Sequence, residues 1–164
     1  MTSYKKDFVF PVYIHEDILN LVKELSKKTD KEIFGYLIGL ILKWKDKKYI
    51  IIKDQIYVKD AVRSKKFITS QIQGTAGEFE KEFQKLKSNS KSKDLRVVGW
   101  WHSHVGLGCF LSPTDIHTHE CFFPESYQVA LVVDPIRDEF KFFTLDKISI
   151  KKYKAVSNAI ISSN

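Results

Sequence analysis

The sequence predicts an α/β domain in which helices pack against one mixed β-sheet. Two observations support this fold class: segments typical of strands alternate with segments of helical periodicity, and hairpin-like pairs of strands stand toward both ends of the chain. The chain has 164 residues, which suits a single domain with a substantial core, and it contains no internal repeat. We therefore expect one domain over residues 1–146 and a tail over residues 147–164.

The first third of the chain predicts a strand, a helix and a hairpin of two strands, over residues 7–14, 16–28, 33–42 and 49–57. Pro11 cannot donate a backbone hydrogen bond, so we expect the first strand at an edge of the sheet. The helix has acidic residues at its start and lysines at its end, as the helix dipole favours. Gly35 and Gly39 interrupt an otherwise apolar segment, which indicates a buried strand that another backbone or a ligand approaches closely.

A long polar segment and a second helix follow. Residues 58–74 lack periodicity and are rich in Lys, Ser, Thr, Gln and Gly, which predicts a functional or mobile loop. Residues 75–78 form a capping-box pattern, so a helix should begin there and continue to about Lys87. Its apolar face is predicted to consist of Ala76, Phe79, Phe83 and Leu86.

The rest of the chain predicts three more strands and one helix. A strand over residues 95–102 leads into a pair of histidines, and a helix begins at Ser112. A buried strand covers residues 127–133, and residues 139–145 complete a hairpin as an edge strand. The tail from Lys147 is basic and is expected to be weakly helical or disordered.

The composition is that of a folded protein in a reducing compartment. Hydrophobic residues make up 43% of the chain, which is too much for a disordered segment. No apolar run approaches the roughly 20 residues of a membrane helix, and the N-terminus lacks the apolar core of a signal peptide. Cys109 and Cys121 are too few for a disulfide framework. We therefore expect a cytoplasmic protein without a membrane span.

The net charge of +7 raises the question of nucleic-acid binding. The lysines are scattered in several short groups, without the interleaved aromatic residues of a base-stacking surface. Solvated helix faces and loops account for them, so we do not expect nucleic acid as a partner.

A pair of histidines at the end of the strand over residues 95–102 indicates a metal site. Alternation along a strand sends His102 and His104 to the same face. Seven residues separate His104 from Ser112, which opens a helix with Asp115 in its first turn. Two imidazoles and a carboxylate leave the fourth position of a zinc ion open to water, as in catalytic zinc sites. We therefore predict one zinc ion on His102, His104 and Asp115.

Each part of this pattern also has a purely structural interpretation. Ser112 could act only as an N-cap, with Pro113 at the first helical position and Asp115 placed favourably against the helix dipole. The two histidines could be satisfied core residues. Three nearby residues compete as ligands, although two histidines and an aspartate already complete an open zinc site; these are Cys109, His117 and His119.

The residues that match a known family extend from about residue 8 to about residue 145. Glu32 begins an apolar segment punctuated by glycine, and later come His-x-His, seven residues, Ser, two residues and Asp. This arrangement resembles the full signature of the MPN+/JAMM metalloproteases. The stretches 98–104 and 106–112 are most similar to the proteasome-lid deubiquitinase and its signalosome deneddylase relative. Many members have Pro after the second His, where this chain has Val105.

The resemblance implies the same α/β fold and a zinc-dependent isopeptidase that removes ubiquitin or a ubiquitin-like modifier from lysine side chains. It implies that Glu32 is the general base, that Ser112 stabilises the oxyanion and that residues 58–74 help to hold the substrate tail. A proteasome-type or other MPN-containing complex is an expected partner. Trp100 and Trp101 alternate, so one should border the substrate groove. Our candidates for that groove are Trp101, Gly106, Cys109 and Phe110.

Two functions of other classes remain open on the sequence. A catalytically silent MPN scaffold would mediate the assembly of a larger complex, although all five positions of the signature are filled. A basic nucleic-acid-binding module has only the net charge in its favour. Bound zinc, and hydrolysis of a ubiquitin-like fusion with and without a chelator, distinguish these functions from an isopeptidase.

Overall fold

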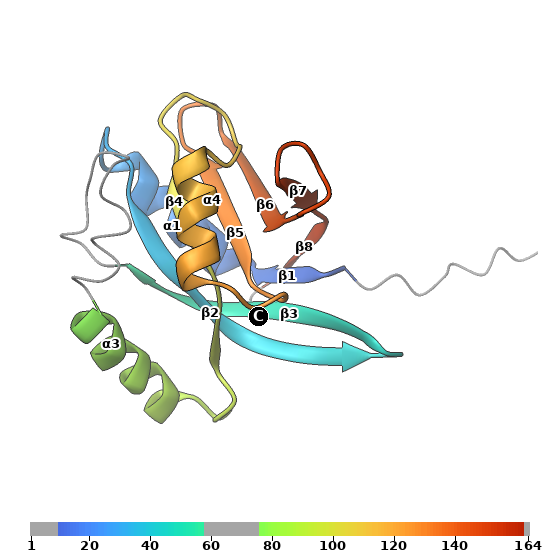
Figure 1. Cartoon of the computed structure of the whole chain (residues 1–164). Helices are drawn as coiled ribbons and strands as arrows, with labels where there is room; N and C mark the ends of the chain where they lie inside the picture. Colours follow the sequence, from blue (N-terminus) through green and yellow to red (C-terminus); the bar gives the residue numbers. More distant parts are fainter. Residues whose placement is uncertain (1–9, 58–75, 163–164) are drawn as a thin grey trace, which may run out of the picture.

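The computed structural model describes residues 10–57 and 76–162, and its centre is one mixed sheet (Figure 1). In these residues the sheet has eight strands, in the order β7-β6-β5-β4-β2-β3-β1-β8. The strands are β1 Val12–His15, β2 Phe34–Trp44, β3 Lys47–Tyr57, β4 Arg96–Ser103, β5 Val129–Asp134, β6 Glu139–Leu145, β7 Tyr153–Val156 and β8 Asn158–Ile161. The described helices are α1 Glu16–Lys27, α3 Ala76–Asn89 and α4 Pro113–Phe122. The predicted α/β domain is confirmed.

The helices cover both faces of the sheet, so the chain buries two apolar clusters. α1 contributes Ile18, Leu19 and Val22 to the first cluster, while α3 and α4 pack against the second. Figure 1 shows α4 in front of the sheet and α1 behind it. Trp100 and Trp101 are both fully buried and belong to opposite clusters, because successive residues of β4 point to opposite faces. The sheet is therefore the middle layer of three.

α3 packs against the sheet through part of the predicted apolar face. Phe79, Phe83 and Leu86 are half-buried against the second cluster, and Phe79 lies 4.2 Å from the ring of Tyr36 between centroids. Ala76, predicted for the same face, is exposed. The capping box expected at the start of this helix involves Thr75, which lies outside the described residues.

The tail forms two strands, so the prediction of a weakly helical or disordered segment is wrong. β7 pairs antiparallel with β6, and β8 pairs parallel with β1. Only Ser157 separates β7 from β8, although they stand at opposite ends of the strand order. The sheet must therefore curve until β6 and β1 approach each other. Strands of four residues contain too few alternating positions for a sequence pattern to reveal them.

The two strands predicted at the edges of the sheet are both interior. β1 lies between β3 and β8, and β6 lies between β5 and β7. Pro11 precedes β1, and its carbonyl oxygen accepts the N–H of Ile50 at 3.0 Å. Pro11 lies outside the strand, so its missing N–H removes no hydrogen-bond donor from β1. An interior position of β1 is therefore compatible with this proline.

The glycines of β2 mark close approaches, as predicted. A Cβ atom at Gly39 would meet the carbonyl oxygen of Ile51 on β3. A Cβ atom at Gly35 would meet the indole ring of Trp101 on β4. β2 is thus a buried strand pressed between its two neighbours, and these positions accept no larger residue without movement of the sheet.

The unit β4-α4-β5 determines where polar side chains gather. β4 and β5 are parallel, with His102 opposite Val132, and α4 connects them. On its other side β4 runs antiparallel to β2, with Phe34 opposite His102. The C-terminal ends of β4 and β5, the start of β2 and the N-terminus of α4 therefore meet at one end of the molecule. Crevices at the carboxyl ends of parallel strands are common ligand sites in α/β proteins.

Candidate metal centre

His102 and His104 lie at the end of β4 and face the same side of the sheet, as strand alternation predicts. Both side chains are buried, and their Nε2 atoms are 3.2 Å apart. The backbone N–H of His104 donates to the carbonyl oxygen of Val133 at 2.9 Å, so the neighbouring strand β5 holds this residue although β4 has ended.

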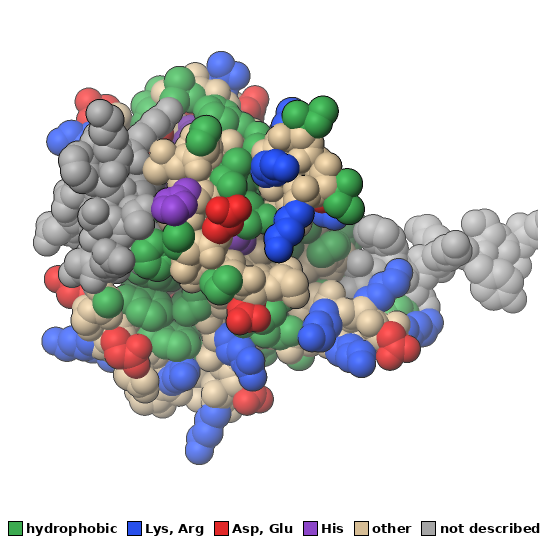
Figure 2. Space-filling view, in the orientation of Figure 1, with side chains coloured by type: hydrophobic (Ala, Val, Ile, Leu, Met, Phe, Trp, Pro, Cys, Tyr) green, Lys and Arg blue, Asp and Glu red, His purple; other side chains and the backbone are tan. Residues whose placement is uncertain are grey.

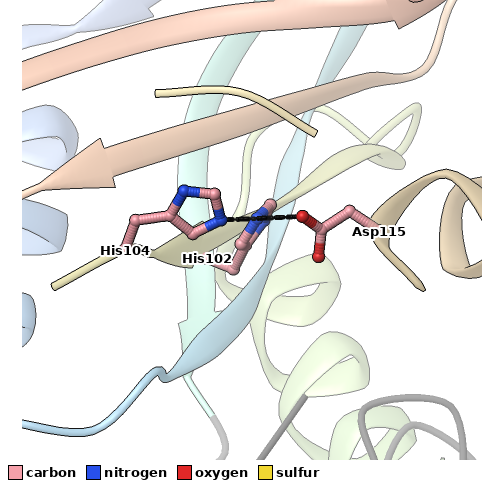
Figure 3. A group of neighbouring side chains, drawn as sticks. All are labelled: His102, His104 and Asp115. Atoms are coloured by element: carbon pink, nitrogen blue, oxygen red, sulfur yellow. Dashed lines mark hydrogen bonds and ion pairs between the residues drawn. The ribbon is translucent and has the colours of Figure 1, made fainter. Parts of the chain in front are cut away.

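Asp115 reaches the two histidines from the first turn of α4 (Figure 3). Its Oδ2 atom is 3.3 Å from Nε2 of His102 and 3.6 Å from Nε2 of His104. Ser112 caps the helix: its Oγ accepts the N–H of Asp115 at 3.2 Å, and Asp115 Oδ2 accepts the N–H of Ser112 at 2.8 Å. The cap interpretation is therefore correct, and the same cap aims the carboxylate at the histidines.

The spacing of these three side chains fits a zinc ion. Zinc bonds of about 2.0–2.1 Å at tetrahedral angles place two ligand atoms about 3.3–3.4 Å apart. The three separations of 3.2, 3.3 and 3.6 Å are close to that value. Within the described residues, this is the one group of three such side chains whose ligand atoms lie within 4.8 Å of one another. The donor set of two imidazoles and one carboxylate is that of an open zinc site.

The electrostatics of the group favour a carboxylate beside a cation. Burial raises the pKa of Asp115, but the adjacent His102 and His104 and the Ser112 N–H outweigh it and lower the pKa below its ordinary value. Burial lowers the pKa of His104, but Asp115, the Gly108 carbonyl and Glu32 outweigh it and raise the pKa. These charges favour a cation at this position, so a metal ion bound here would compete with a proton on His104.

Different contacts orient the imidazole rings of His104 and His102. His104 Nδ1 donates to the carbonyl oxygen of Gly108 at 2.8 Å, which leaves Nε2 free for a metal. His102 Nδ1 has no hydrogen-bond partner among the described residues. Its ring stacks on Trp100 instead, with 4.5 Å between centroids and 14° between planes. Packing therefore orients one ring, and a hydrogen bond orients the other.

Glu32 stands near this group although 69 residues separate it from His102 in the chain. Ile33 and Ser103 exchange backbone contacts at the ends of β2 and β4: the N–H of Ser103 donates to the carbonyl of Ile33, and the N–H of Ile33 donates to Ser103 Oγ, each at 3.0 Å. Continuing this antiparallel register places Glu32 opposite His104. The half-buried Glu32 carboxylate accordingly contributes to the raised pKa of His104.

The predicted groove residues fall into different environments. Trp101 is fully buried on the α1 side and its Nε1 donates to Gln55 at 3.1 Å, so its prediction as a groove residue is wrong. Phe110 is half-buried, and its ring centroid lies 4.6 Å from that of His104. Cys109 is half-buried and its thiol donates to the carbonyl of Val132; burial raises its pKa to about 11, which disfavours a thiolate ligand.

The other histidines of α4 do not join the metal ligands. His119 is buried, and its Nδ1 accepts the indole N–H of Trp100 at 3.2 Å. Burial lowers the pKa of His119 to about 4, so the ring is neutral at pH 7. His117 is exposed and lies 3.6 Å from the Sγ of Cys121 through its Nε2.

Asp134, the last residue of β5, lies close to this group, although no pattern in the sequence singled it out. It is fully buried and accepts hydrogen bonds from the N–H groups of Gly106 and Gly108, in the loop that follows His104. The remaining acceptor contacts are to Ile136 and Arg137. An acid directly after a buried strand and before a proline was the available signal, but its long-range partners were not visible in the sequence.

The predicted loop over residues 58–74, with its expected role in holding the substrate tail, lies outside the described residues. Over the part of the chain that the structure covers, no helix combines the length and apolar character required to traverse a lipid bilayer.

Comparison with known proteins gives partial matches to subunits of two complexes. The 26S proteasome regulatory subunit RPN11 of Eremothecium gossypii is 40% identical over 73 residues, which are 44% of this chain and 22% of that protein. The COP9 signalosome complex subunit 5 of Debaryomyces hansenii is 32% identical over 111 residues, 66% of this chain and 22% of that protein. The aligned part thus spans about a fifth of the length of these relatives.

A solved structure matches over nearly the whole chain. The solution structure of a protein from Desulfitobacterium hafniense has a TM-score of 0.61 and 12% identity, and the match covers 93% of this chain and 94% of that one. At this identity the match concerns the fold alone. The model of the family described as JAB1/Mov34/MPN/PAD-1 ubiquitin protease matches residues 8–125, which include Glu32 and the three predicted zinc ligands. The chain therefore belongs to the JAB1/Mov34/MPN/PAD-1 family.

Proposed function

We propose that this protein is a zinc-dependent isopeptidase that removes ubiquitin or a ubiquitin-like modifier from lysine side chains. The observation that carries the proposal is the trio His102, His104 and Asp115, whose ligand atoms have tetrahedral spacing in a member of a family described as ubiquitin proteases. These residues would hold one zinc ion, which when bound supplies a Lewis acid and lowers the pKa of a water molecule to about 7.

Glu32 is the proposed general base. It precedes β2, and its negative charge is one of those that raise the pKa of His104, which supports a place for its carboxylate near the metal centre. It would accept a proton from the attacking water and deliver it to the leaving lysine amine. Half-burial allows it to exchange protons with a substrate, as a base must.

Ser112 is the proposed donor to the oxyanion. Its Oγ accepts the N–H of Asp115 in the helix cap, and this use of a lone pair leaves the hydroxyl proton available. Removal of a comparable donor typically costs about 3 kcal/mol of transition-state stabilisation. Phe110 borders the same space, so we keep it as the groove candidate with direct support from its contact with His104.

The substrate class and partners rest on the relatives. One relative from Saccharomyces cerevisiae, 37% identical over 73 residues, is named ubiquitin carboxyl-terminal hydrolase RPN11. The other relatives described above are named as subunits of the 26S proteasome and of the COP9 signalosome. We propose that this chain acts on modifier conjugates in the cytoplasm and joins a proteasome-type or other MPN-containing complex.

The test combines metal content with hydrolysis. Purified protein should contain about one zinc per chain and should cleave a ubiquitin-like fusion to a lysine side chain, and a strong chelator should abolish cleavage until zinc is restored. Protein that binds zinc but cleaves no modifier fusion, alone or with partner subunits, would instead support a silent scaffold.

A further inference from the structure

Asp134 connects the end of β5 to the loop that follows the metal ligand His104. Its carboxylate divides its contacts between its two oxygens. Oδ1 accepts the N–H of Gly106 at 3.0 Å and also serves the following turn, through the N–H groups of Ile136 at 3.0 Å and Arg137 at 3.1 Å. Oδ2 accepts the N–H of Gly108 at 2.7 Å and also lies 3.9 Å from the Nε of Arg137, an ion pair with a half-exposed side chain.

Gly108 connects Asp134 to His104 through two hydrogen bonds. Its N–H is held by Asp134, and its carbonyl oxygen accepts the Nδ1 hydrogen of His104 at 2.8 Å. All three residues are buried. Gly106 and Gly108 have φ of 77° and 82°, a left-handed conformation that favours glycine, so the loop turns back toward Asp134 at both positions. An ionised acceptor and a buried environment make these hydrogen bonds short and strong.

We propose that Asp134 is a positioning residue for the zinc ligand His104, acting through Gly108. By anchoring Gly108, the carboxylate holds the acceptor that keeps the hydrogen on His104 Nδ1 and leaves Nε2 directed at the metal. This inference rests on the proposed zinc site.

A purely structural role for Asp134 would be limited to its turn. Gly106, Ile136 and Arg137 all bind Oδ1, and only Gly108 binds Oδ2 among the backbone donors. An Asn side chain retains one acceptor oxygen and replaces the other with an NH2 donor. Because three N–H groups favour the oxygen at the Oδ1 position, Asp134→Asn should retain the turn. The new NH2 group then faces the N–H of Gly108, and two donors cannot form a hydrogen bond.

A matched control lies at the opposite end of the same strand. The side chain of Gln128 accepts the N–H of Glu125 through Oε1 and donates to the carbonyl of Val97 through Nε2, each at 3.0 Å. Gln128→Glu therefore also exchanges one polar atom of a buried residue and disrupts one partly buried hydrogen bond, the one to Val97. Gln128 contacts neither the loop after His104 nor the proposed metal ligands. This variant therefore shows how far general destabilisation of the fold alone changes zinc affinity.

The experiment measures zinc affinity by chelator competition for the full chain, with inorganic zinc as the probe, and follows solvent exchange of the His104 ring hydrogen by NMR of 15N-labelled imidazole. Asp134→Asn should weaken zinc binding by about 10–100-fold, the usual effect of disturbing a ligand's outer partner, and should speed exchange of the Nδ1 hydrogen in metal-free protein. Gln128→Glu should change neither quantity, although its unfolding temperature falls.

Two outcomes would overturn the inference: unchanged zinc affinity and exchange in Asp134→Asn, or equal losses in both variants. Failure of the proposed function is distinguishable from these. If His104 were no zinc ligand, His104→Ala would leave zinc affinity intact, whereas the exchange of the ring hydrogen in metal-free protein would still report whether Asp134 positions that ring.

Discussion

His104 combines three contacts in one imidazole ring. Nδ1 is engaged by Gly108, Nε2 faces His102 and Asp115, and the ring packs beside Phe110. A side chain with so many partners has one available orientation, so its replacement should affect metal binding more than any single packing contact does.

Removal of a ligand should abolish tight zinc binding. His104→Ala and Asp115→Ala each delete one of three protein ligands, so we expect loss of stoichiometric zinc after dialysis, measured by atomic absorption. Cys109→Ser is the control: its thiol donates to Val132 and has a pKa of about 11, so this variant should keep its zinc. Full zinc content in both ligand variants would refute the assigned site.

Glu32→Gln separates metal binding from proton transfer. The amide has nearly the shape of the carboxylate but accepts no proton, so zinc content should be unchanged while kcat falls by about 100–10,000-fold, the usual range for loss of a general base. The measurement is cleavage of a modifier fusion at saturating substrate. Normal turnover would exclude Glu32 as the base.

The metal-free protein should have a distinctive pH dependence of stability. The pKa of His104 is raised, so its contribution to stability is fully present below about pH 6.5, the unfolded value, and is lost as the pH rises through the raised pKa. The pKa of Asp115 is lowered, so its contribution is lost only in acid, below about pH 3.9.

Thermal unfolding in chelator should therefore show a stability gap between wild type and His104→Gln that is constant below about pH 6.5 and narrows as the pH rises from there into the alkaline range. Gln has no titrating group at this position, so the variant supplies the baseline. A gap that is constant over this interval would mean that the His104 pKa is not raised in the folded protein.

At the scale of elements, the tail completes the sheet. β7 covers the outer edge of β6 with Tyr153 packed edge-on against Phe143, at 5.3 Å between ring centroids, and β8 covers the outer edge of β1. An unpaired edge exposes backbone donors and acceptors and promotes association with other chains. The segment expected to be a weakly helical or disordered tail is thus part of the sheet.

Truncation after Asp146 should destabilise the protein and cause aggregation. It removes two strands and leaves β6 and β1 as bare edges, so we expect the unfolding temperature to fall by at least about 10 °C, since each kcal/mol shifts it by roughly 2–4 °C in a domain of this size. Ile150→Ser is the control, because Ile150 is 100% exposed between β6 and β7 and should leave the temperature unchanged. A stable, monomeric truncated protein would show that the tail strands contribute little.

At the scale of the whole molecule, the distribution of surface charge bears on which partners the protein can bind. Figure 2 shows Lys and Arg side chains distributed around the visible face with acidic side chains among them, instead of gathered along one stripe. On this face the described Lys and Arg side chains therefore do not form a stripe that would follow a phosphate backbone, despite the net charge of +7.

Binding to duplex DNA should accordingly be weak and non-specific. We expect dissociation constants of about 10⁻⁴ to 10⁻⁶ M at physiological salt, with a steep loss of affinity as salt increases. Fluorescence anisotropy across a salt series measures this, with a neutral-surface protein of similar size as control. Tight binding to one DNA sequence that persists at high salt would instead support a nucleic-acid-binding function.

The sequence by itself determined the main secondary structure and the local arrangement of the three proposed zinc ligands. Strand alternation places His102 and His104 on one face, and the helix start places Asp115 one turn from its cap; both relations are local and survive in the fold. The long apolar runs of β2 and β5 also have local causes, since strands covered on both faces are apolar throughout.

Only the tertiary structure decided which distant residues meet. Glu32 reaches the site because β2 pairs with β4 in a register set by Phe34 and His102, and Asp134 binds Gly108 because β5 lies beside β4. Trp101 is buried because both faces of β4 are covered, and the short tail strands form because two sheet edges were available to pair with. Each of these depends on pairing between segments far apart in the chain, which local periodicity does not encode.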